Sequence, residues 1–598
     1  MCRIAGMVHP GMDVKNIEQT VLGMCKLLQH GGPDDEGLYT SHADHLVLGN
    51  RRLAILDLSS AGHQPMSYQD RYHITYNGEI YNFRELKEEL QDLGHYFLTH
   101  TDTEVILAAY SQWNTHSFSK FKGMFAFAIW DNHLKELLLV RDAAGMKPMY
   151  YSTATGGMVF ASEIRAFKMV SYLGEADKNW PVYLMAYGHI PEPATTLKEV
   201  KPLHKGCFLK YELHSGKQNL QSFAHYSYTK KKFVGGENVS NEVVNTFTNA
   251  VERHLIADAP LGVFLSGGLD SGIISSVASS LKKSRLNSLS LYFEDEEYSE
   301  KKYQDILLNE LQCTPHQYLL GETEFHANFP AILAAMDMPG CDGINTWFIS
   351  KFAAQEGLKA VLSGIGADEL FGGYPSFTRI KFSGLLRHVP KMLTSRGRGS
   401  SIKRFNRLSY LQLNGIKGTY LFLRGHFSPN DIARQLGNSE KEVWSILDQM
   451  PVINELNDLQ LKNQASWMEF NMYMQNQLLR DADVMGMAHG IEIRIPFLDD
   501  EFVRMVLKID PEEKYGGPLP KQWLIDRYKD MLPQPIWDRP KMGFSFPFRK
   551  WLTNSTYVKE MMKNGGVQTQ KNYLKFLEGN LHWSQLMSLI ILSNRNEA

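Results

Sequence analysis

The chain has 598 residues, of which 43% are hydrophobic and 21% charged, and its 63 basic and 65 acidic residues leave a formal charge of −2. This length favours two to four domains, and the near-neutral charge gives no electrostatic reason to expect binding to nucleic acid or to an anionic membrane surface. Five cysteines are too few for a disulfide framework, no stretch approaches ~18 consecutive apolar residues, and the first residues lack the apolar core of a secretory signal. We therefore expect a cytoplasmic enzyme with no nucleic-acid or membrane partner.

The first 228 residues alternate helices with short strands. Apolar residues recur at helical spacing from Val14 to His30, and the pattern stops at a Gly-Gly-Pro turn. A second helix is expected over Asn82–Leu93, with Asn82 as its cap, Glu85 three residues on and Gly94 at its end. A third is expected to open at a capping box over residues 101–104.

Four strands are expected in quick succession between residues 124 and 163. Their sequences are MFAFAIW, ELLLVR, MYYS and MVFAS, joined by tight connections. The polar stretch that follows residue 228 carries Gly235-Gly236 and predicts a linker. We therefore divide the chain into a first domain at 2–228, a linker at 229–240 and a second domain at 241–598.

The second domain shows a different order of elements, in which a strand is followed by a glycine loop and then a helix. Leu261–Leu265 predicts a buried strand, SGGLDSG a loop, and the apolar face from Ile273 to Leu281 a helix. SLSLYF and KAVLSG predict further strands of a parallel sheet, and the chain reads mostly helical from about residue 377. The expected class is α/β: an α+β first domain, then a doubly wound parallel sheet with a helical extension.

Cys2 is the first candidate for catalysis. It becomes the terminal residue if Met1 is removed, and the α-amine, with a pKa near ~7.7–8.0, could then take the proton from its own thiol. The alternative is a buried, inert cysteine in a first strand, which is the common fate of a lone cysteine.

Four motifs after Cys2 favour the catalytic interpretation. They are RRLAILD at 51–57, QPM at 64–66, YNGEIYN at 76–82 and TDTE at 101–104. Together with Cys2 they resemble the glutaminase domain of class II (N-terminal nucleophile) glutamine amidotransferases over about residues 2–200. The resemblance implies an αββα sandwich of the Ntn-hydrolase type that releases ammonia from glutamine.

The resemblance also implies roles for the motif residues. Asn77 and the backbone N–H of Gly78 would hold the oxyanion of the tetrahedral intermediate. A guanidinium fork suits the carboxylate of glutamine, and carboxylates suit its ammonium. Local alternatives exist, because Asn-Gly is a common hairpin turn and an acidic residue is favoured in a helix's first turn. The expected glutamine pocket comprises Arg52, Leu53, Ile55, Asn77, Gly78, Glu79 and Asp102.

Arg3 departs from the family pattern, which usually has glycine after the nucleophile. A cationic side chain there could lower the pKa of the Cys2 thiol, or it could crowd the glutamine pocket. If it disables the glutaminase, the chain becomes a ligase that depends on free ammonia.

A second site is indicated by residues 265–271, LSGGLDS, which follow a strand and open a helix. Small residues let backbone N–H groups converge on phosphate oxygens at the helix N-terminus. The loop resembles that of ATP pyrophosphatases, and the alternative is an ordinary glycine-rich turn. The loop at 363–374, SGIGADELFGGY, also follows a strand, so the two would line one crevice.

This crevice is expected to hold Mg²⁺ and ATP. Asp270 and Asp368 would bind Mg²⁺ through hard oxygen ligands, and the resemblance implies that Leu265 and Leu291 pack against the nucleotide. The expected ATP-binding residues are Leu265, Ser266, Gly267, Gly268, Asp270, Ser271, Leu291, Ser363 and Gly364.

Three later segments extend the resemblance to nearly the whole chain. LRDAD at 479–483, GIEIRIPFLD at 490–499 and RPKMGF at 539–544 resemble motifs of glutamine-hydrolysing asparagine synthetases. Lys541 matches the lysine that neutralises the α-phosphate in that family, whereas Arg494 could equally be a buried ion-pair residue. The implied substrates are glutamine, ATP with Mg²⁺ and aspartate; no organic prosthetic group is expected, and a homodimer is one open assembly.

Ile365 is the second departure, because the family's loop commonly has glutamate there. It leaves open another carboxylate acceptor, such as a uronic acid in surface-polysaccharide synthesis. A non-enzymatic binding role is the contrasting class, but it predicts the loss of Cys2, Asp270 or Asp368, and all three are present.

Overall fold

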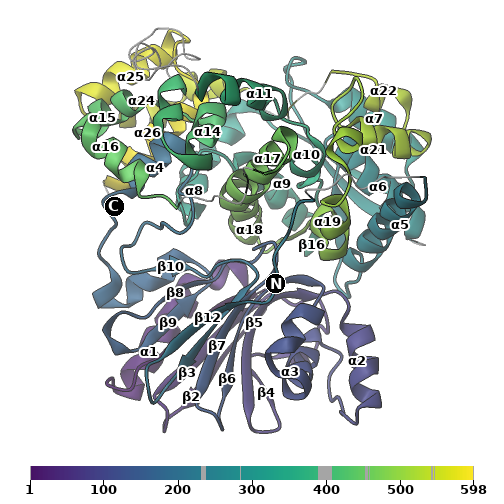
Figure 1. Cartoon of the computed structure of the whole chain (residues 1–598), viewed down its shortest axis with the longest axis vertical. Helices are drawn as coiled ribbons and strands as arrows, with labels where there is room; N and C mark the ends of the chain where they lie inside the picture. Colours follow the sequence, from purple (N-terminus) through teal and green to yellow (C-terminus); the bar gives the residue numbers. More distant parts are fainter. Residues whose placement is uncertain are drawn as a thin grey trace.

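The computed structural model describes residues 2–229, 237–282, 285–387, 407–451, 456, 458–540, 543 and 546–596. Figure 1 shows two parts, with β-sheets in the lower half and a mainly helical body above them. Over the described ranges, no helix combines the length and apolarity needed to cross a membrane. All five cysteines are free and buried.

The first part contains two six-stranded antiparallel sheets. The first has the order β10-β8-β9-β1-β3-β2 and the second the order β12-β11-β7-β6-β5-β4. The strands of the first are β1 (Cys2–Val8), β2 (Asp35–Ser41), β3 (Leu46–Arg52), β8 (Tyr150–Ser152), β9 (Met158–Ala161) and β10 (Lys201–Pro202). Those of the second are β4 (Met66–Tyr68), β5 (Tyr72–Ile80), β6 (Gly123–Asp131), β7 (Glu136–Arg141), β11 (Cys207–Glu212) and β12 (Gln218–Ser222).

Strand alternation builds four layers from these sheets. Ile4 and Val8 of β1 pack against Trp130 of β6 in the core between the sheets. The intervening Met7 faces α1 (Val14–Leu27), and Phe127 of β6 faces the core under α2 (Phe83–Asp92) and α3 (Asp102–Trp113). Because successive side chains of a strand point to opposite faces, each sheet buries both faces. The αββα sandwich is therefore confirmed.

Two of the three expected helix starts differ in detail. The side chain of Asn82 makes no capping bond to α2, because its amide donates to Lys120 O and accepts from Lys122 N. Thr101 does cap α3 by accepting from the N–H of Glu104. The Glu104 carboxylate, however, binds the N–H groups of residues 98 and 99 instead of the cap. Tertiary contacts have replaced the expected local bonds.

The second part is built on a five-stranded parallel sheet with the order β15-β14-β13-β16-β17. Its strands are β13 (Leu261–Phe264), β14 (Leu286–Tyr292), β15 (Cys313–Leu319), β16 (Ala360–Leu362) and β17 (Glu492–Arg494). Strand order reverses between β13 and β16, so their following loops meet at the topological switch point. The sequence pattern did not predict β17, which has only three residues in a helical region.

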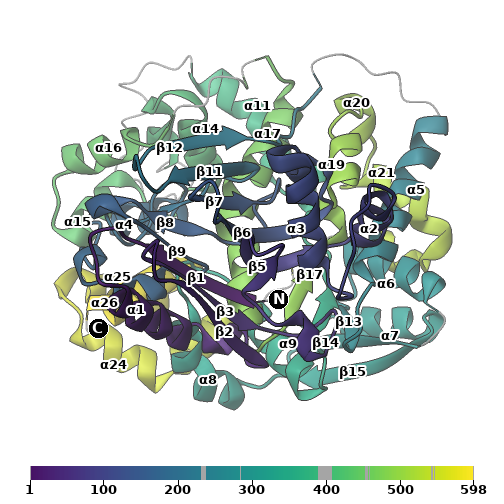
Figure 2. The same cartoon turned by 90° about the horizontal axis from the view of Figure 1, so that it is seen from below.

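Helices surround this sheet and form the extension seen at the top of Figure 1. α4 (Trp180–Tyr187) belongs to the first part by sequence but packs among helices of the extension (Figure 2). Around the sheet lie α5 (Glu237–His254), α6 (Leu269–Leu281), α7 (Lys301–Glu310), α8 (Glu322–Ala335), α9 (Ile344–Gln355), α10 (Ala367–Phe371) and α11 (Ser376–Arg387). Later helices are α14 (Gly415–Arg424), α15 (Pro429–Leu436), α16 (Glu440–Asp448), α17 (Leu461–Met468), a π-helix (Glu469–Leu478), α18 (Leu479–Met487), α19 (Asp500–Val506), α20 (Pro511–Lys514), α21 (Gln522–Tyr528), α22 (Gln534–Trp537), α23 (Phe548–Asn554), α24 (Thr556–Asn564), α25 (Val567–Leu577) and α26 (Trp583–Asn596).

The intersheet core should dominate the stability of the first part. Leu139 is fully buried there, whereas Leu134 in the β6–β7 turn is 56% exposed. Leu139→Ala is expected to lower the free energy of unfolding by about 2–5 kcal/mol and the unfolding temperature by roughly 5–15 °C. Calorimetry of the full chain measures this, and Leu134→Ala is the matched control with little expected change. Equal shifts for the two variants would contradict the assignment of the core.

Candidate active sites

Cys2 lies at the start of β1 with only 5% of its surface exposed. Its backbone N donates to Oδ1 of Asn77 at 3.1 Å. Nδ2 of Asn77 is buried and has no hydrogen-bond partner among the residues described. Burial raises the pKa of the Cys2 thiol, against the lowering effects of the Leu53 backbone N–H and of Arg52. A buried thiol thus lies beside an amide donor that has no partner among the described residues.

Gly78 follows Asn77 on β5, at a point where only glycine fits. Its φ is +152°, and a Cβ atom would lie 2.1 Å from the carbonyl oxygen of Met124 on β6. The absence of a side chain therefore permits the cross-strand approach. This keeps the Gly78 backbone next to the Asn77 amide.

The Arg52 guanidinium donates most of its hydrogen bonds to the loop that follows β3. Nη1 donates to Ser59 O at 3.0 Å, and Nη2 donates to the carbonyls of Leu56 and Asp57 at 3.2 and 2.5 Å. Three of its five N–H groups are thus engaged by this loop. The neighbouring Leu53 and Ile55 are buried.

Glu79 and Asp102 bring two carboxylates to the same buried region. Asp102 Oδ2 accepts from the Tyr76 hydroxyl at 2.8 Å and from the Ile80 N–H at 2.9 Å. Burial raises the pKa of Asp102 to about 6. Burial, Glu492 and Asp102 together raise the pKa of Glu79 well above its usual value. A ligand ammonium would relieve this cost, because an opposite charge favours the ionised carboxylates.

Arg494 confirms the ion-pair interpretation and joins the two parts of the chain. It is fully buried on β17, with Nε 2.5 Å from Glu492 Oε1 and Nη2 3.6 Å from Glu79 Oε1. Its Nη1 donates to the carbonyls of His254 and Ile256. The carboxylate expected to bind the glutamine ammonium is therefore tied to the edge of the parallel sheet.

Arg3 takes neither of the two roles expected from the sequence. Its side chain is fully buried, with Nε 2.7 Å from Glu163 Oε1 and Nη1 2.7 Å from Asp483 Oδ2. Since neighbouring residues of a strand face opposite sides, Arg3 does not crowd the pocket beside Cys2. Two carboxylates neutralise its charge, and it is not among the main causes of the shift in the pKa of Cys2.

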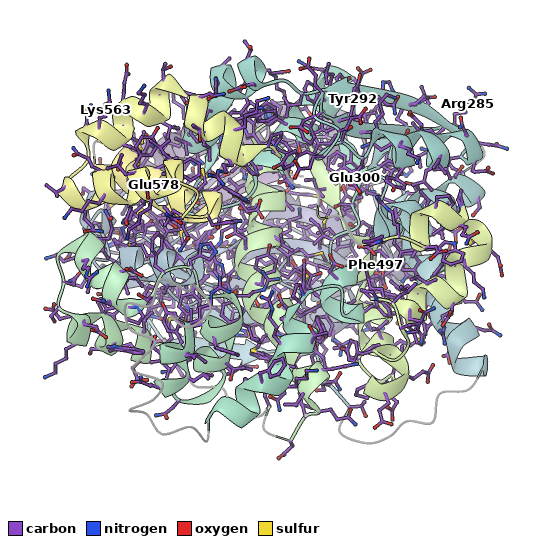
Figure 3. The ribbon with its side chains drawn as sticks, turned by 90° about the horizontal axis from the view of Figure 1, so that it is seen from above. Arg285, Tyr292, Glu300, Phe497, Lys563 and Glu578 are labelled. Atoms are coloured by element: carbon purple, nitrogen blue, oxygen red, sulfur yellow. The ribbon has the colours of Figure 1, made fainter. Side chains whose placement is uncertain are left out.

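The loop after β13 is closed by its own hydroxyl groups. Ser266 Oγ lies 3.0 Å from Ser271 Oγ and accepts from the Gly268 N–H at 3.3 Å. Gly267 adopts a φ of +84°. Arg539 Nη2 donates to the Gly267 carbonyl at 2.9 Å and pairs with Glu300 at 2.8 Å; Glu300 is labelled in Figure 3. The loop is thereby anchored from the outside.

The loop after β16 touches the first loop, as expected for one crevice. A Cβ atom on Gly364 would lie 3.1 Å from Cβ of Asp270. Cavities of about 980 and 260 Å³ adjoin here and share Ser266, Asp270, Gly364 and Ile365 in their walls. The smaller cavity is lined by seven of the nine predicted ATP-binding residues, all except Gly267 and Gly268.

Lys521 is the important residue that the sequence interpretation missed. Its Nζ lies 2.7 and 2.6 Å from the two carboxylate oxygens of Asp270 and 2.7 Å from Asp368 Oδ1. Burial acts to lower the pKa of Lys521, but the two aspartates outweigh it and raise the pKa above its usual value. The two predicted metal ligands thus converge on one cationic atom.

No local sequence pattern marks Lys521 beyond the Pro-Leu-Pro that precedes it. In the structure it lies at the N-terminus of α21, where the helix dipole disfavours a cation. Its φ is +58°, which is uncommon and costly for a side chain of this kind. The predicted lysine, Lys541, lies outside the described residues.

Comparisons with known proteins match both parts of the chain. A family model described as a glutamine amidotransferase domain matches residues 1–224, and one described as asparagine synthase matches residues 242–579. The glutamine-hydrolyzing asparagine synthetase 1 of Bacillus subtilis is 32% identical over 588 residues, which cover 94% of this chain and 89% of that protein. A putative asparagine synthetase of Mycobacterium bovis is 30% identical, covering 88% and 84%. Amidase chry2 of Gibberella zeae is 25% identical, covering 92% and 90%.

Gly78 offers a direct test of the close strand approach at the first site. Gly78→Ala combines a positive φ with a clash against the backbone of β6, while Gly94→Ala has a φ of +91° and no atom within 4 Å. We expect Gly94→Ala to lower the free energy of unfolding by about 1 kcal/mol and Gly78→Ala to lower it clearly more. Glutamine hydrolysis should be lost only in Gly78→Ala. Thermal unfolding and glutamate release measure the two effects. If both variants behave alike, the cross-strand contact does not constrain the site.

Proposed function

This chain belongs to the glutamine-hydrolysing asparagine synthetase family, whose members are carbon–nitrogen ligases, and we propose that it makes asparagine from aspartate, glutamine and ATP. The observation that carries the proposal is the hydrogen bond from the Cys2 backbone N to Oδ1 of Asn77, whose buried Nδ2 has no hydrogen-bond partner among the described residues, in a chain that also holds a phosphate-type loop. One site would release nitrogen, and the other would activate the carboxylate that receives it.

At the first site, the amine of Cys2 would take the thiol proton once Met1 is removed. The sulfur would attack the glutamine amide carbon, while Asn77 Nδ2 and the Gly78 N–H stabilise the developing oxyanion. Breakage of the C–N bond releases ammonia, with the proton returned to the leaving nitrogen, and leaves a thioester that water hydrolyses to glutamate. Arg52 would bind the carboxylate of the substrate, and Glu79 and Asp102 its ammonium.

At the second site, the aspartate side-chain carboxylate would attack the α-phosphorus of ATP and displace pyrophosphate. Backbone N–H groups of the 265–271 loop and the N-terminus of α6 would hold the β- and γ-phosphates. Ammonia would then attack the acyl-adenylate carbon and displace AMP. An internal route between the sites keeps ammonia unprotonated and the adenylate away from water.

Asp270 and Asp368 fit a divalent cation, because they converge on one point that is now met by the Lys521 ammonium. Mg²⁺ is commonly held by one or two carboxylates together with substrate phosphates, and when bound it neutralises phosphate charge. Lys521 lies at the same point, where its charge would stabilise the leaving pyrophosphate.

A different carboxylate acceptor is the second candidate function. Ile365 lines both cavities in place of the glutamate that the family commonly has. One relative over the whole length carries a different name, amidase chry2. Isoleucine cannot accept a hydrogen bond from an amino-acid ammonium, which favours a less polar contact at this point.

The test measures pyrophosphate, AMP and glutamate with ATP, Mg²⁺ and a panel of aspartate, other amino acids and uronic acids. Wild type should release pyrophosphate with aspartate from either glutamine or ammonia. Cys2→Ala should lose the glutamine-dependent reaction at least 10³-fold, on the order expected for loss of a nucleophile, and should keep the ammonia-dependent one. Intact mass verifies the removal of Met1. A response to uronic acids alone would replace aspartate as the acceptor, and no response to any acid would refute the function.

Lys521 should be needed for pyrophosphate release but not for glutamine hydrolysis. Lys521→Met is expected to lower pyrophosphate release at least 10²-fold, because two partly buried carboxylates and the triphosphate lose their shared cation. Lys462→Met is the matched control, since Lys462 lines the same cavity but donates to the Tyr515 carbonyl. Glutamate release should survive in both variants. Comparable pyrophosphate rates for the two variants would remove Lys521 from the proposed mechanism.

A further inference from the structure

We propose that Arg3 is a positioning residue through which nucleotide binding in the synthetase half controls the glutaminase nucleophile. The link runs from the smaller cavity through α18 to Asp483, and from Asp483 through Arg3 to Cys2. This inference rests on the proposed function and adds a regulatory connection between its two sites.

The first step is the contact between Arg3 and Asp483. Both side chains are buried, with 0% and 3% exposure, and the Nη1–Oδ2 distance is 2.7 Å. The other Asp483 oxygen lies 3.4 Å from Lys147 Nζ, so one carboxylate of the synthetase half receives two cations from the glutaminase half. Buried charges of this kind are costly to separate, so Arg3 and Asp483 are expected to move together.

The second step is that α18 connects the smaller cavity to Arg3. In Figure 1 this helix lies at the side of the helical body that faces the β-sheets. Asp481 lines the smaller cavity, whose wall also contains the predicted nucleotide residues Leu265 and Leu291. Residues two apart on a helix point about 200° from each other. A single turn therefore presents Asp481 to the cavity and Asp483 to Arg3.

The Asp481 side chain is held by close contacts on two sides. Gln477 Nε2 donates to its Oδ2 at 2.5 Å. Gly343, with a φ of +90°, approaches so closely that a Cβ atom would lie 2.9 Å from the Asp481 carboxyl carbon. A nucleotide that enters this cavity therefore cannot displace Asp481 without shifting the turn of α18 that carries it.

The third step is the position of Arg3 one peptide bond from Cys2. Glu163 holds Arg3 Nε at 2.7 Å, and Asn77 holds the Cys2 backbone N at 3.1 Å from the other side. A displacement of the Asp483 side chain would therefore change the orientation of the Cys2 thiol relative to the Asn77 side chain. The glutaminase rate should then respond to an occupied nucleotide cavity, which avoids ammonia release when no ATP is present.

The experiment compares the rate of glutamine hydrolysis with and without Mg·ATP, in the absence of any acceptor, for three variants. Arg3→Lys keeps the charge but lacks the fork that reaches both carboxylates, and Asp483→Asn keeps the shape but removes the charge. Lys122→Met is the matched control, because it breaks the 2.6 Å ion pair of Lys122 with Glu501, which joins the halves away from β1 and α18. Ammonia-dependent pyrophosphate release reports whether each variant is folded.

Wild type and Lys122→Met should hydrolyse glutamine at least about fivefold faster with Mg·ATP, the lower range of allosteric coupling. The ratio should fall to near one in Arg3→Lys and Asp483→Asn, with ammonia-dependent release within twofold of wild type. A merely structural Arg3 would lower both rates and leave their ratio intact, and that result overturns the proposal, as does a wild-type ratio of one. If either Arg3→Lys or Asp483→Asn cannot be produced as folded protein, the other variant tests the proposal by the same ratio of glutamine hydrolysis with and without Mg·ATP. Absent glutamine hydrolysis in wild type would instead refute the proposed function.

Discussion

Buried charge pairing across the interface between the two halves is the constraint on which the rest of this structure depends. Arg494 on the parallel sheet reaches Glu79 of the glutaminase part, and Asp483 on α18 reaches Arg3 beside Cys2. Charges removed from water must be paired or neutralised. The interface therefore has few alternative arrangements, and the two sites are held in one geometry.

The same constraint has a chemical use. In the proposed reaction, a charge-paired boundary would help to keep water from ammonia and from an activated carboxylate. The two predicted metal ligands follow the same rule on the synthetase side, since Lys521 neutralises Asp270 and Asp368 before any substrate enters. The left-handed backbone of Lys521 indicates that local strain is accepted to place this cation.

Periodicity and glycine placement were enough to predict much of the fold. The strands at 124–163, the 261–265 strand with its loop and helix, and the position of Gly94 were all confirmed. The bonds expected of Asn82 and Glu104 were not, because loops distant in sequence engage their side chains. β17 was missed, since three residues carry too little pattern and depend on pairing with β16.

By itself, the sequence determined the family and predicted the motif residues that would carry its two chemistries, because a cysteine at position 2, a glycine that permits close approach and a glycine-rich loop after a strand are local properties of the chain. Only the tertiary structure decided the role of Arg3, the partners of Arg494 and the place of Lys521. Each of these depends on a carboxylate more than 200 positions away, such as Asp483 for Arg3, and no local pattern records which distant charge will share a buried site.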